Sequence, residues 1–253
     1  MNQIGLQLYT VRKRLNTKEE SRATLEKIKE IGYRSVQLFG SGDSLENATC
    51  WAQLAREQGL SLSGILINLE SCELNEQALF ALCKECEIPD IGISSSPAEL
   101  QELASYIERV NRFAAKARAA GFSFSFHNHA HEFIRHGDGK HAMEHFFASF
   151  SKDVDFMPDT YWLHTGGCDV RHFLEETRGR VTLLHLKDLK RLESGQTFAE
   201  VGKGNLWFKG ILQTALDCGI HQFIVEQDQC DGDPLESIRI SYQNAKALLE
   251  EVK

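Results

Sequence analysis

Residues 122–133 read FSFSFHNHAHEF, and the organisation of the whole chain can be worked out from this stretch. Phe122, Phe124 and Phe126 alternate with serines, and an apolar side chain at every second position predicts a β-strand. Three histidines and Glu132 follow directly. Imidazoles and a carboxylate at the carboxyl end of an apolar strand are the groups that a metal site or an acid/base site requires.

The pattern of a strand followed by a helix repeats on both sides of this stretch. The other predicted strands span residues 4–10, 33–39, 60–68, 88–93, 154–158, 181–186 and 221–225. The predicted helices span residues 18–31, 45–58, 71–86, 98–120, 140–150, 170–176, 208–218 and 234–252. Eight such units of about 30 residues each have the size of a (β/α)8 barrel.

The sequence therefore predicts an α/β protein with one (β/α)8 TIM-barrel domain over residues 1–253. No linker or low-complexity segment divides the chain. An open, doubly wound sheet is the alternative α/β architecture, and it favours a glycine-rich loop after the first strand. Residues 7–12 contain no glycine, which disfavours this alternative.

The composition argues against several classes of protein. With 42% hydrophobic residues the chain can build a large core, but no apolar run approaches the ~20 residues of a membrane span. No secretory signal is visible at the start, so we expect a cytoplasmic protein without a membrane partner. Seven scattered cysteines do not resemble a disulfide framework. A net charge of −8 without a basic cluster argues against nucleic-acid binding.

Polar groups end the last four predicted strands, and the carboxyl ends of barrel strands all open on one face. In strand order these groups are His127 with Glu132, then Asp159, His185 and Glu226. Any one of them has a structural explanation, such as a helix cap or a buried histidine. Four at the same level of a barrel favour a metal site.

Several motifs resemble the xylose isomerase-like TIM-barrel family of sugar phosphate isomerases and epimerases, over essentially the whole chain. They are IGLQLYTVR at 4–12, HNHAHEF at 127–133, DTYW at 159–162, HLKD at 185–188 and VEQD at 225–228. The resemblance implies one divalent cation, held by one residue from each of the last four strands. Carried over to this sequence, the ligands are Glu132, Asp159, His185 and Glu226.

The first of these ligands departs from the family pattern. Better-known members have a glutamate at the strand end itself, where this chain has His127, and Glu132 follows five residues later. In a straight strand Glu132 would face away from the histidines. The chain must bend after about His129 for Glu132 to reach the metal. If it does not bend, His127 or His129 is the substitute ligand.

Three carboxylates and an imidazole favour Mn²⁺ or Mg²⁺, while Zn²⁺, Co²⁺ and Fe²⁺ are alternatives. A sugar hydroxyl and carbonyl can chelate such an ion, which would lower the pKa of the hydroxyl and stabilise an enediolate. Glu132 and Glu226 are the first candidates for the accompanying proton transfer. His129, His131 and Lys187 are the second candidates.

Further residues can line a pocket at this end of the barrel, although packing or surface charge explains them equally well. They are Tyr9, Arg12, His127, His131, Tyr161, Trp162 and Lys203. The run Gly202-Lys203-Gly204-Asn205 can hold a phosphate through its backbone amides, or it can form a loop before the next helix.

The resemblance implies a metal-dependent isomerase or epimerase that acts on a keto-sugar or polyol. The same enediolate can instead expel a group, so a dehydratase or lyase acting on a keto-sugar, keto-inositol or keto-glycoside is an alternative. Endonucleases of this fold use three zinc ions and many more ligands, and the acidic charge disfavours that function. A sugar-binding barrel without chemistry is a remote alternative. Barrels of this class often pair, so a homo-oligomer is compatible with the sequence.

Overall fold

The computed structural model describes residues 3–40 and 45–252. The barrel strands are β1 (Gln3–Gln7), β2 (Ser35–Phe39), β3 (Ser61–Ile67), β4 (Asp90–Ile93), β5 (Ser123–His127), β6 (Asp155–Met157), β7 (Leu184–Leu186) and β10 (Gln222–Val225). The helices are α1 (Lys18–Ile31), α2 (Glu46–Glu57), α3 (Leu69–Leu74), α4 (Glu76–Cys86), α5 (Leu100–Ala119), α6 (Ala142–Ser149), α7 (Thr160–Thr165), α8 (Val170–Glu176), α9 (Phe208–Asp217) and α10 (Pro234–Glu251). The remaining elements are the hairpin β8 (Asp188–Leu192) and β9 (Gly195–Ala199) and the 3-10 helices η1 (Leu8–Arg14) and η2 (His131–Phe133).

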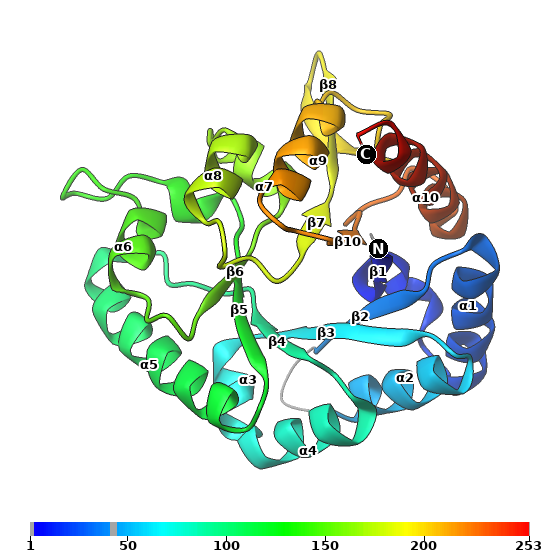
Figure 1. Ribbon diagram of the computed structural model, residues 1–253, viewed down its shortest axis with the longest axis horizontal. Coiled ribbons are helices and arrows are strands. Elements are labelled where there is room, and N and C mark those ends of the chain that lie inside the picture. The colour runs from blue at the N-terminus through cyan, green and yellow to red at the C-terminus, as the bar shows by residue number, and fades with distance from the viewer. Residues whose placement is uncertain (1–2, 41–44, 253) are drawn as a thin grey trace.

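Eight parallel strands form one sheet in the order β6-β5-β4-β3-β2-β1-β10-β7. Its two ends meet, because β6 and β7 are joined by isolated bridges, one of them between Asp159 and His185. Helices surround the strands on the outside (Figure 1). The structure therefore confirms the predicted (β/α)8 barrel. The predicted domain of residues 1–253 also includes residues 1–2, 41–44 and 253, which lie outside the described part.

Most predicted elements lie within a few residues of their expected positions, and local sequence explains why. The helix predicted at 18–31 has these bounds in the structure. Its start is fixed by a capping box, in which Thr17 and Glu20 each bond the backbone N–H of the other. Gly32 ends it with a φ of 126°, a conformation that glycine adopts at little cost.

Two predictions about element length were wrong. The helix expected over 71–86 is two helices, because the backbone leaves the helical region at Asn75, whose side chain donates to Ser71 O. The first strand ends at Gln7 rather than residue 10, since the Gln7 side chain accepts from Tyr9 N and turns the chain into η1. The hairpin β8–β9 and helix α7 were not predicted.

In strand β5, the alternating residues face the two sides of the barrel wall. Phe124 and Phe126 pack against helix residues, with ring centroids 5.4 Å from Phe113 and 4.9 Å from Phe146. Ser125, on the opposite side of the strand, lies in the barrel interior and bonds Thr182 across it at 3.0 Å. The phenylalanines therefore build the layer between strands and helices, while the side chains between them face the inside.

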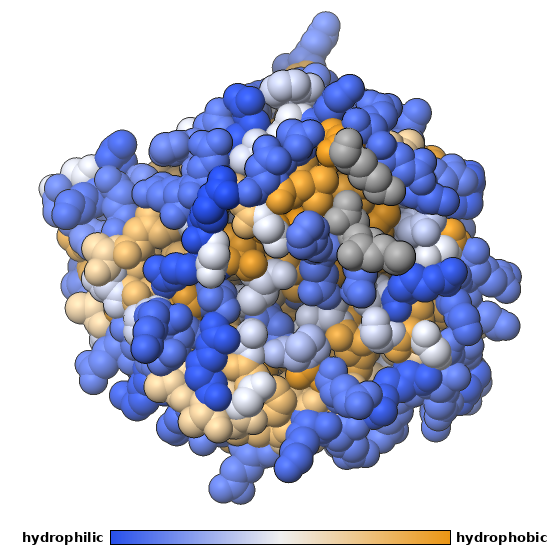
Figure 2. Space-filling view, viewed as in Figure 1, coloured by the Kyte–Doolittle hydropathy of each residue, from blue (hydrophilic) through white to orange (hydrophobic). Residues whose placement is uncertain are grey.

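Hydrophilic residues cover most of the face shown in Figure 2, with smaller apolar areas between them. Among the helices of the described residues, none has the length and apolarity needed to cross a membrane.

Candidate metal centre

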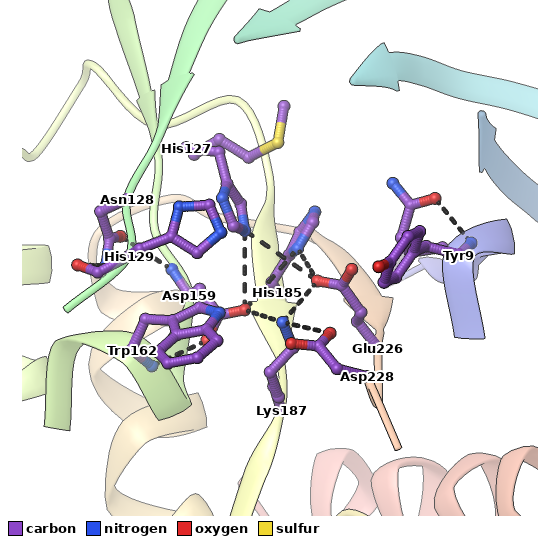
Figure 3. A network of polar contacts seen from close by, with 12 residues as sticks. Tyr9, His127, Asn128, His129, Asp159, Trp162, His185, Lys187, Glu226 and Asp228 are labelled. Carbon is purple, nitrogen blue, oxygen red and sulfur yellow. Dashed lines mark hydrogen bonds and ion pairs between the residues drawn. The ribbon is translucent and has the colours of Figure 1, made fainter. Parts of the chain in front are cut away.

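Four buried side chains converge at the carboxyl ends of neighbouring barrel strands (Figure 3). They are His127 at the end of β5, Asp159 after β6, His185 in β7 and Glu226 after β10. One nitrogen or oxygen atom from each lies within 4.8 Å of all the others. These atoms come from residues that lie up to about a hundred positions apart, and only barrel closure brings them together.

The spacing of the four atoms suits a single cation. His127 Nε2 lies 3.6 Å from Asp159 Oδ2 and 3.9 Å from Glu226 Oε2. His185 Nδ1 lies 3.9 Å from Asp159 Oδ2 and 2.8 Å from Glu226 Oε2. Ligand bonds of about 2.0–2.2 Å around one ion put ligand atoms about 3–4 Å apart. Two imidazoles and two carboxylates can therefore share one ion here with small adjustments.

Unpartnered polar atoms support the same conclusion. Both ring nitrogens of His127 are buried and lack a hydrogen-bond partner among the described residues. Buried polar atoms are nearly always partnered, and each exception calls for an explanation. A divalent ion held by these atoms would provide one, so the residues present fit a metal.

A chain of three side chains fixes the orientation of His185. Tyr9 N donates to Gln7 Oε1, which leaves the Gln7 amide nitrogen to donate to Gln37 Oε1 at 2.7 Å. Gln37 Oε1 can then only accept from His185 Nε2, at 2.7 Å. His185 Nδ1 therefore faces Glu226 Oε2 at 2.8 Å, the direction from which it can bind a metal ion once it has given up its proton.

We expect Gln37→Leu to weaken divalent metal binding by about 10–100-fold, because His185 loses the acceptor that sets its tautomer. Isothermal titration with Mn²⁺ measures the effect. Gln213→Leu, an exposed change on α9, is the control and should bind as the wild type does. Unchanged affinity in Gln37→Leu would show that the glutamine pair does not orient the ligand.

The buried ammonium of Lys187 lies beside the group of four clustered side chains, His127, Asp159, His185 and Glu226. Its Nζ lies 3.1 Å from Asp159 Oδ2, 3.0 Å from Glu226 Oε2 and 2.9 Å from Asp228 Oδ1, and the residue is 1% exposed. Burial alone would raise the pKa of Glu226, but Lys187 and His185 outweigh it and hold this pKa well below its usual range. Burial would likewise lower the pKa of Lys187, and the three carboxylates outweigh it and raise that pKa.

A cavity of about 330 Å³ opens beside these groups. It is lined by Gln7, Tyr9, Phe39, Gly40, Leu66, Ile67, Asn68, Ser94, His127, His129, Lys187, Glu226 and Asp228. Burial lowers the pKa of His129 to about 3, so its imidazole is neutral near pH 7. Burial raises the pKa of Asp228 to about 6. The cavity thus combines an apolar wall with several proton donors and acceptors.

Comparison with known proteins identifies the family. Residues 25–247 match the family described as xylose isomerase-like TIM barrel. The chain belongs to the xylose isomerase-like TIM-barrel family. The match covers most of the chain, and it confirms the resemblance seen in the motifs. None of the curated proteins matches this chain in sequence.

Solved structures of the same fold include proteins with sugar-related names. A sugar phosphate isomerase/epimerase from Parabacteroides distasonis is 20% identical, with a TM-score of 0.82 over 96% of this chain and 97% of the other. An L-ribulose 3-epimerase is 13% identical, with a TM-score of 0.76 over 100% and 96%. A xylose isomerase-like TIM-barrel protein from Mycobacterium smegmatis in complex with magnesium is 14% identical, with a TM-score of 0.73 over 100% and 98%. At these identities the likeness shows the fold.

In this protein, Glu132 lies outside the group of four clustered side chains. The chain bends after β5 as anticipated, but η2 turns the Glu132 carboxylate towards Ser96 Oγ at 2.9 Å and His129 N at 2.8 Å. The carboxylate is fully buried there and forms a second group with His129 and His131. His127, one of the two substitutes predicted from the sequence beside His129, lies next to Asp159. The group of four therefore contains His127 in the position for which the family resemblance implied Glu132.

The residues predicted to line the pocket divide into two sets. Tyr9 and His127 line the cavity, together with His129, Lys187 and Glu226, which were predicted for proton transfer. Arg12, His131, Tyr161, Trp162 and Lys203 are outside this lining.

Arg12 and Trp162 support the lining instead of forming it. The Arg12 guanidinium lies over the Tyr9 ring, 4.0 Å from its centroid, and donates to Asp228 O at 2.9 Å. The Trp162 ring lies 5.3 Å from the His129 ring. These two contacts hold Tyr9 and His129 on opposite sides of the group.

The remaining residues of that set lie farther from the chemistry. Tyr161 is buried and stacks on Phe198 of β9, with ring centroids 4.4 Å apart. The His131 ring stacks on His129, and its side chain is 39% exposed. Lys203 is an exposed side chain in the turn after β9. None of the three has a polar atom at the group of four in the described part of the chain.

The run Gly202–Asn205 has an internal partner that occupies its amides. Asp188 Oδ2 accepts from Gly202 N and Gly204 N, each at 2.9 Å. Asp188 Oδ1 accepts from Leu189 N at 2.7 Å and Leu206 N at 3.2 Å. The alternative that this run binds a phosphate is thereby disfavoured, because a protein carboxylate already takes the position of the anion.

Asp228, Gln7 and Gln37 contribute to the site but were not among the predicted residues. Asp228 had a signal, since it follows Glu226 by two positions and an extended chain directs such side chains to the same side. The two glutamines had none. A polar residue inside an apolar strand becomes meaningful only once its neighbour across the barrel is known.

Proposed function

We propose that this protein is a metal-dependent sugar isomerase or epimerase that acts on a keto-sugar or polyol. The observation that carries the proposal is the group of four clustered side chains beside a 330 Å³ cavity at the carboxyl end of the barrel. Catalytic groups of TIM-barrel enzymes gather at this end. The family of this chain and its structural similarity to an L-ribulose 3-epimerase support such a role.

The ion would be held by His127, Asp159, His185 and Glu226. When bound, it would supply a positive charge that polarises a sugar carbonyl and acidifies a neighbouring hydroxyl. Two imidazole ligands make Zn²⁺ or Mn²⁺ as reasonable as Mg²⁺. This shifts the earlier preference for Mn²⁺ or Mg²⁺, which assumed three carboxylates.

The cavity suits a small polar substrate. Its volume lies near the lower end of the range of about 300–1,000 Å³ that is usual for ligand sites. Asn68 and Ser94 offer hydrogen bonds to hydroxyl groups, and Tyr9 and Phe39 form an aromatic wall with ring centroids 5.3 Å apart. A monosaccharide presents both hydroxyls and an apolar ring face, so these walls match it.

Proton donors and acceptors lie on two sides of the group of four. Asp228 and Tyr9 lie on the side of the group where Glu226 is, and His129 lies on the opposite side (Figure 3). Removal of a carbon-bound proton on one face and its return on the other inverts a stereocentre. Return on the same side, at the adjacent carbon, isomerises the sugar. We assign Glu226 as the first base, and His129 and Lys187 as the further groups for proton transfer. Glu132 is not assigned a role in proton transfer, because its carboxylate accepts a hydrogen bond from Ser96 and lies outside the group of four.

Incubation with a panel of ketopentoses and ketohexoses in deuterium oxide tests this function. We expect deuterium at the carbon next to the carbonyl and a new sugar of the same mass apart from the label, measured by NMR and mass spectrometry. Treatment with EDTA should stop the exchange without unfolding, because the core between strands and helices is apolar. Exchange that survives complete metal removal would contradict metal dependence.

The alternative of a dehydratase or lyase uses the same site. The Lys187 ammonium, 2.9 Å from Asp228 Oδ1, supplies an acid that can protonate a departing oxygen. In the same experiment this reaction releases water or an alcohol and lowers the mass of the sugar. A panel that includes keto-inositols and keto-glycosides therefore separates the two functions.

A further inference from the structure

Lys187 is paired with the two oxygens that the proposed ion would need. Its ammonium nitrogen lies 3.1 Å from Asp159 Oδ2 and 3.0 Å from Glu226 Oε2. The same oxygens face His127 Nε2 and His185 Nδ1. A divalent ion among these four side chains would take over the oxygens with which the ammonium is paired, and its charge would repel the ammonium at short range.

A third carboxylate lies where the ammonium can turn. Asp228 Oδ1 is 2.9 Å from Lys187 Nζ, and Asp228 is not one of the four clustered side chains. Its side chain is 21% exposed and lines the cavity, whereas Asp159 is fully buried. The pair of Lys187 with Asp228 can therefore persist after the other two carboxylates have been taken.

The charges of this cluster also favour an exchange of one cation for another. Asp159, Glu226 and Asp228 carry three negative charges, and Lys187 carries one positive charge. A buried charge without a partner is costly, so the ammonium lowers the cost of the carboxylates before an ion arrives. A divalent ion then completes the neutralisation while Lys187 remains charged.

We propose that the Lys187 ammonium is an internal cation that competes with the divalent metal ion for Asp159 and Glu226, and that metal binding displaces it onto Asp228. This inference rests on the metal site of the proposed function. This competition makes metal binding weaker, and exchange of the metal ion faster, than they would be with the four side chains alone. It also leaves Asp228, on the cavity wall, as the remaining carboxylate partner of the ammonium when the ion is bound.

Removal of the ammonium should tighten metal binding. We expect Lys187→Met and Lys187→Gln to lower the dissociation constant for Mn²⁺ by at least about tenfold, measured by isothermal titration at constant ionic strength. Lys190→Met removes the same charge from an exposed position on β8 and should bind as the wild type does. The stabilisation by saturating Mn²⁺, measured as the shift in Tm, should be larger in both Lys187 variants than in the wild type.

The outcomes separate this inference from the proposed function. Equal or weaker Mn²⁺ binding in the Lys187 variants overturns the competition, even if the wild type binds the ion. If neither the wild type nor any variant binds Mn²⁺, Zn²⁺ or Mg²⁺, the metal site itself fails and the competition fails with it. If Lys187→Met does not fold, Lys187→Gln provides the same comparison, because its amide can still donate to the carboxylates.

A double-mutant cycle tests the displacement onto Asp228. Asp228→Asn should weaken Mn²⁺ binding in the wild type, because it removes both a nearby negative charge and the carboxylate to which Lys187 turns. In the Lys187→Gln background only the first of these effects remains, so the loss should be smaller. Equal losses in the two backgrounds would overturn the displacement.

Discussion

Glu226→Gln is expected to abolish turnover, with a loss of about 10²–10³-fold or more, while the barrel stays folded. Glu226 is a candidate ligand and the assigned base, and the amide can neither bind a cation as strongly nor accept the carbon-bound proton. Metal affinity should fall by more than the about 10–100-fold that a change outside the ligands costs. The rate of deuterium exchange and the metal content after dialysis are the two measurements.

Glu132→Gln is the matched control, because it makes the same chemical change at a second buried glutamate of the same barrel end. Glu132 bonds Ser96 and the backbone of His129 and lies outside the group of four. Its variant should keep its metal. If Glu132→Gln loses the ion while Glu226→Gln retains it, the ligand set proposed above is wrong and the family pattern at Glu132 is restored.

Asp188→Ala should lower the free energy of unfolding by about 3–5 kcal/mol, because four backbone N–H groups lose a charged acceptor. The carboxylate binds the amides of Leu189, Gly202, Gly204 and Leu206. It thereby joins the start of the β8–β9 hairpin to the turn that follows it. A Cβ at Gly204 would collide with Asp188, which shows how closely this turn encloses the carboxylate.

Urea unfolding followed by circular dichroism measures the effect. Asp188→Asn keeps one acceptor oxygen and should lose less than the alanine variant. Asp231→Ala, on an exposed loop, is the control and should change stability by no more than about 0.5 kcal/mol. A stability change of that size in Asp188→Ala would mean that water replaces the carboxylate without cost.

The sequence predicted the barrel well because its signals are local. These signals affect only neighbouring residues, so they can be recognised in the sequence alone. They include the alternating Phe124 and Phe126, the capping box at Thr17 and the helix end at Gly32. The break at Asn75 was missed for the opposite reason. A continuous apolar period favours one helix, whereas the structure has two, divided at Asn75, where φ is −113° and ψ is 22°.

The amino-acid sequence by itself determined the fold class, the strand ends that carry polar groups, and three of the four clustered side chains, since strand order fixes which ends share a face. Only the tertiary structure decided the fourth. The direction of the Glu132 carboxylate depends on a turn of η2 and on Ser96, which is 36 residues away in the chain. The central position of Lys187 among three carboxylates likewise results from barrel closure, which no local pattern encodes.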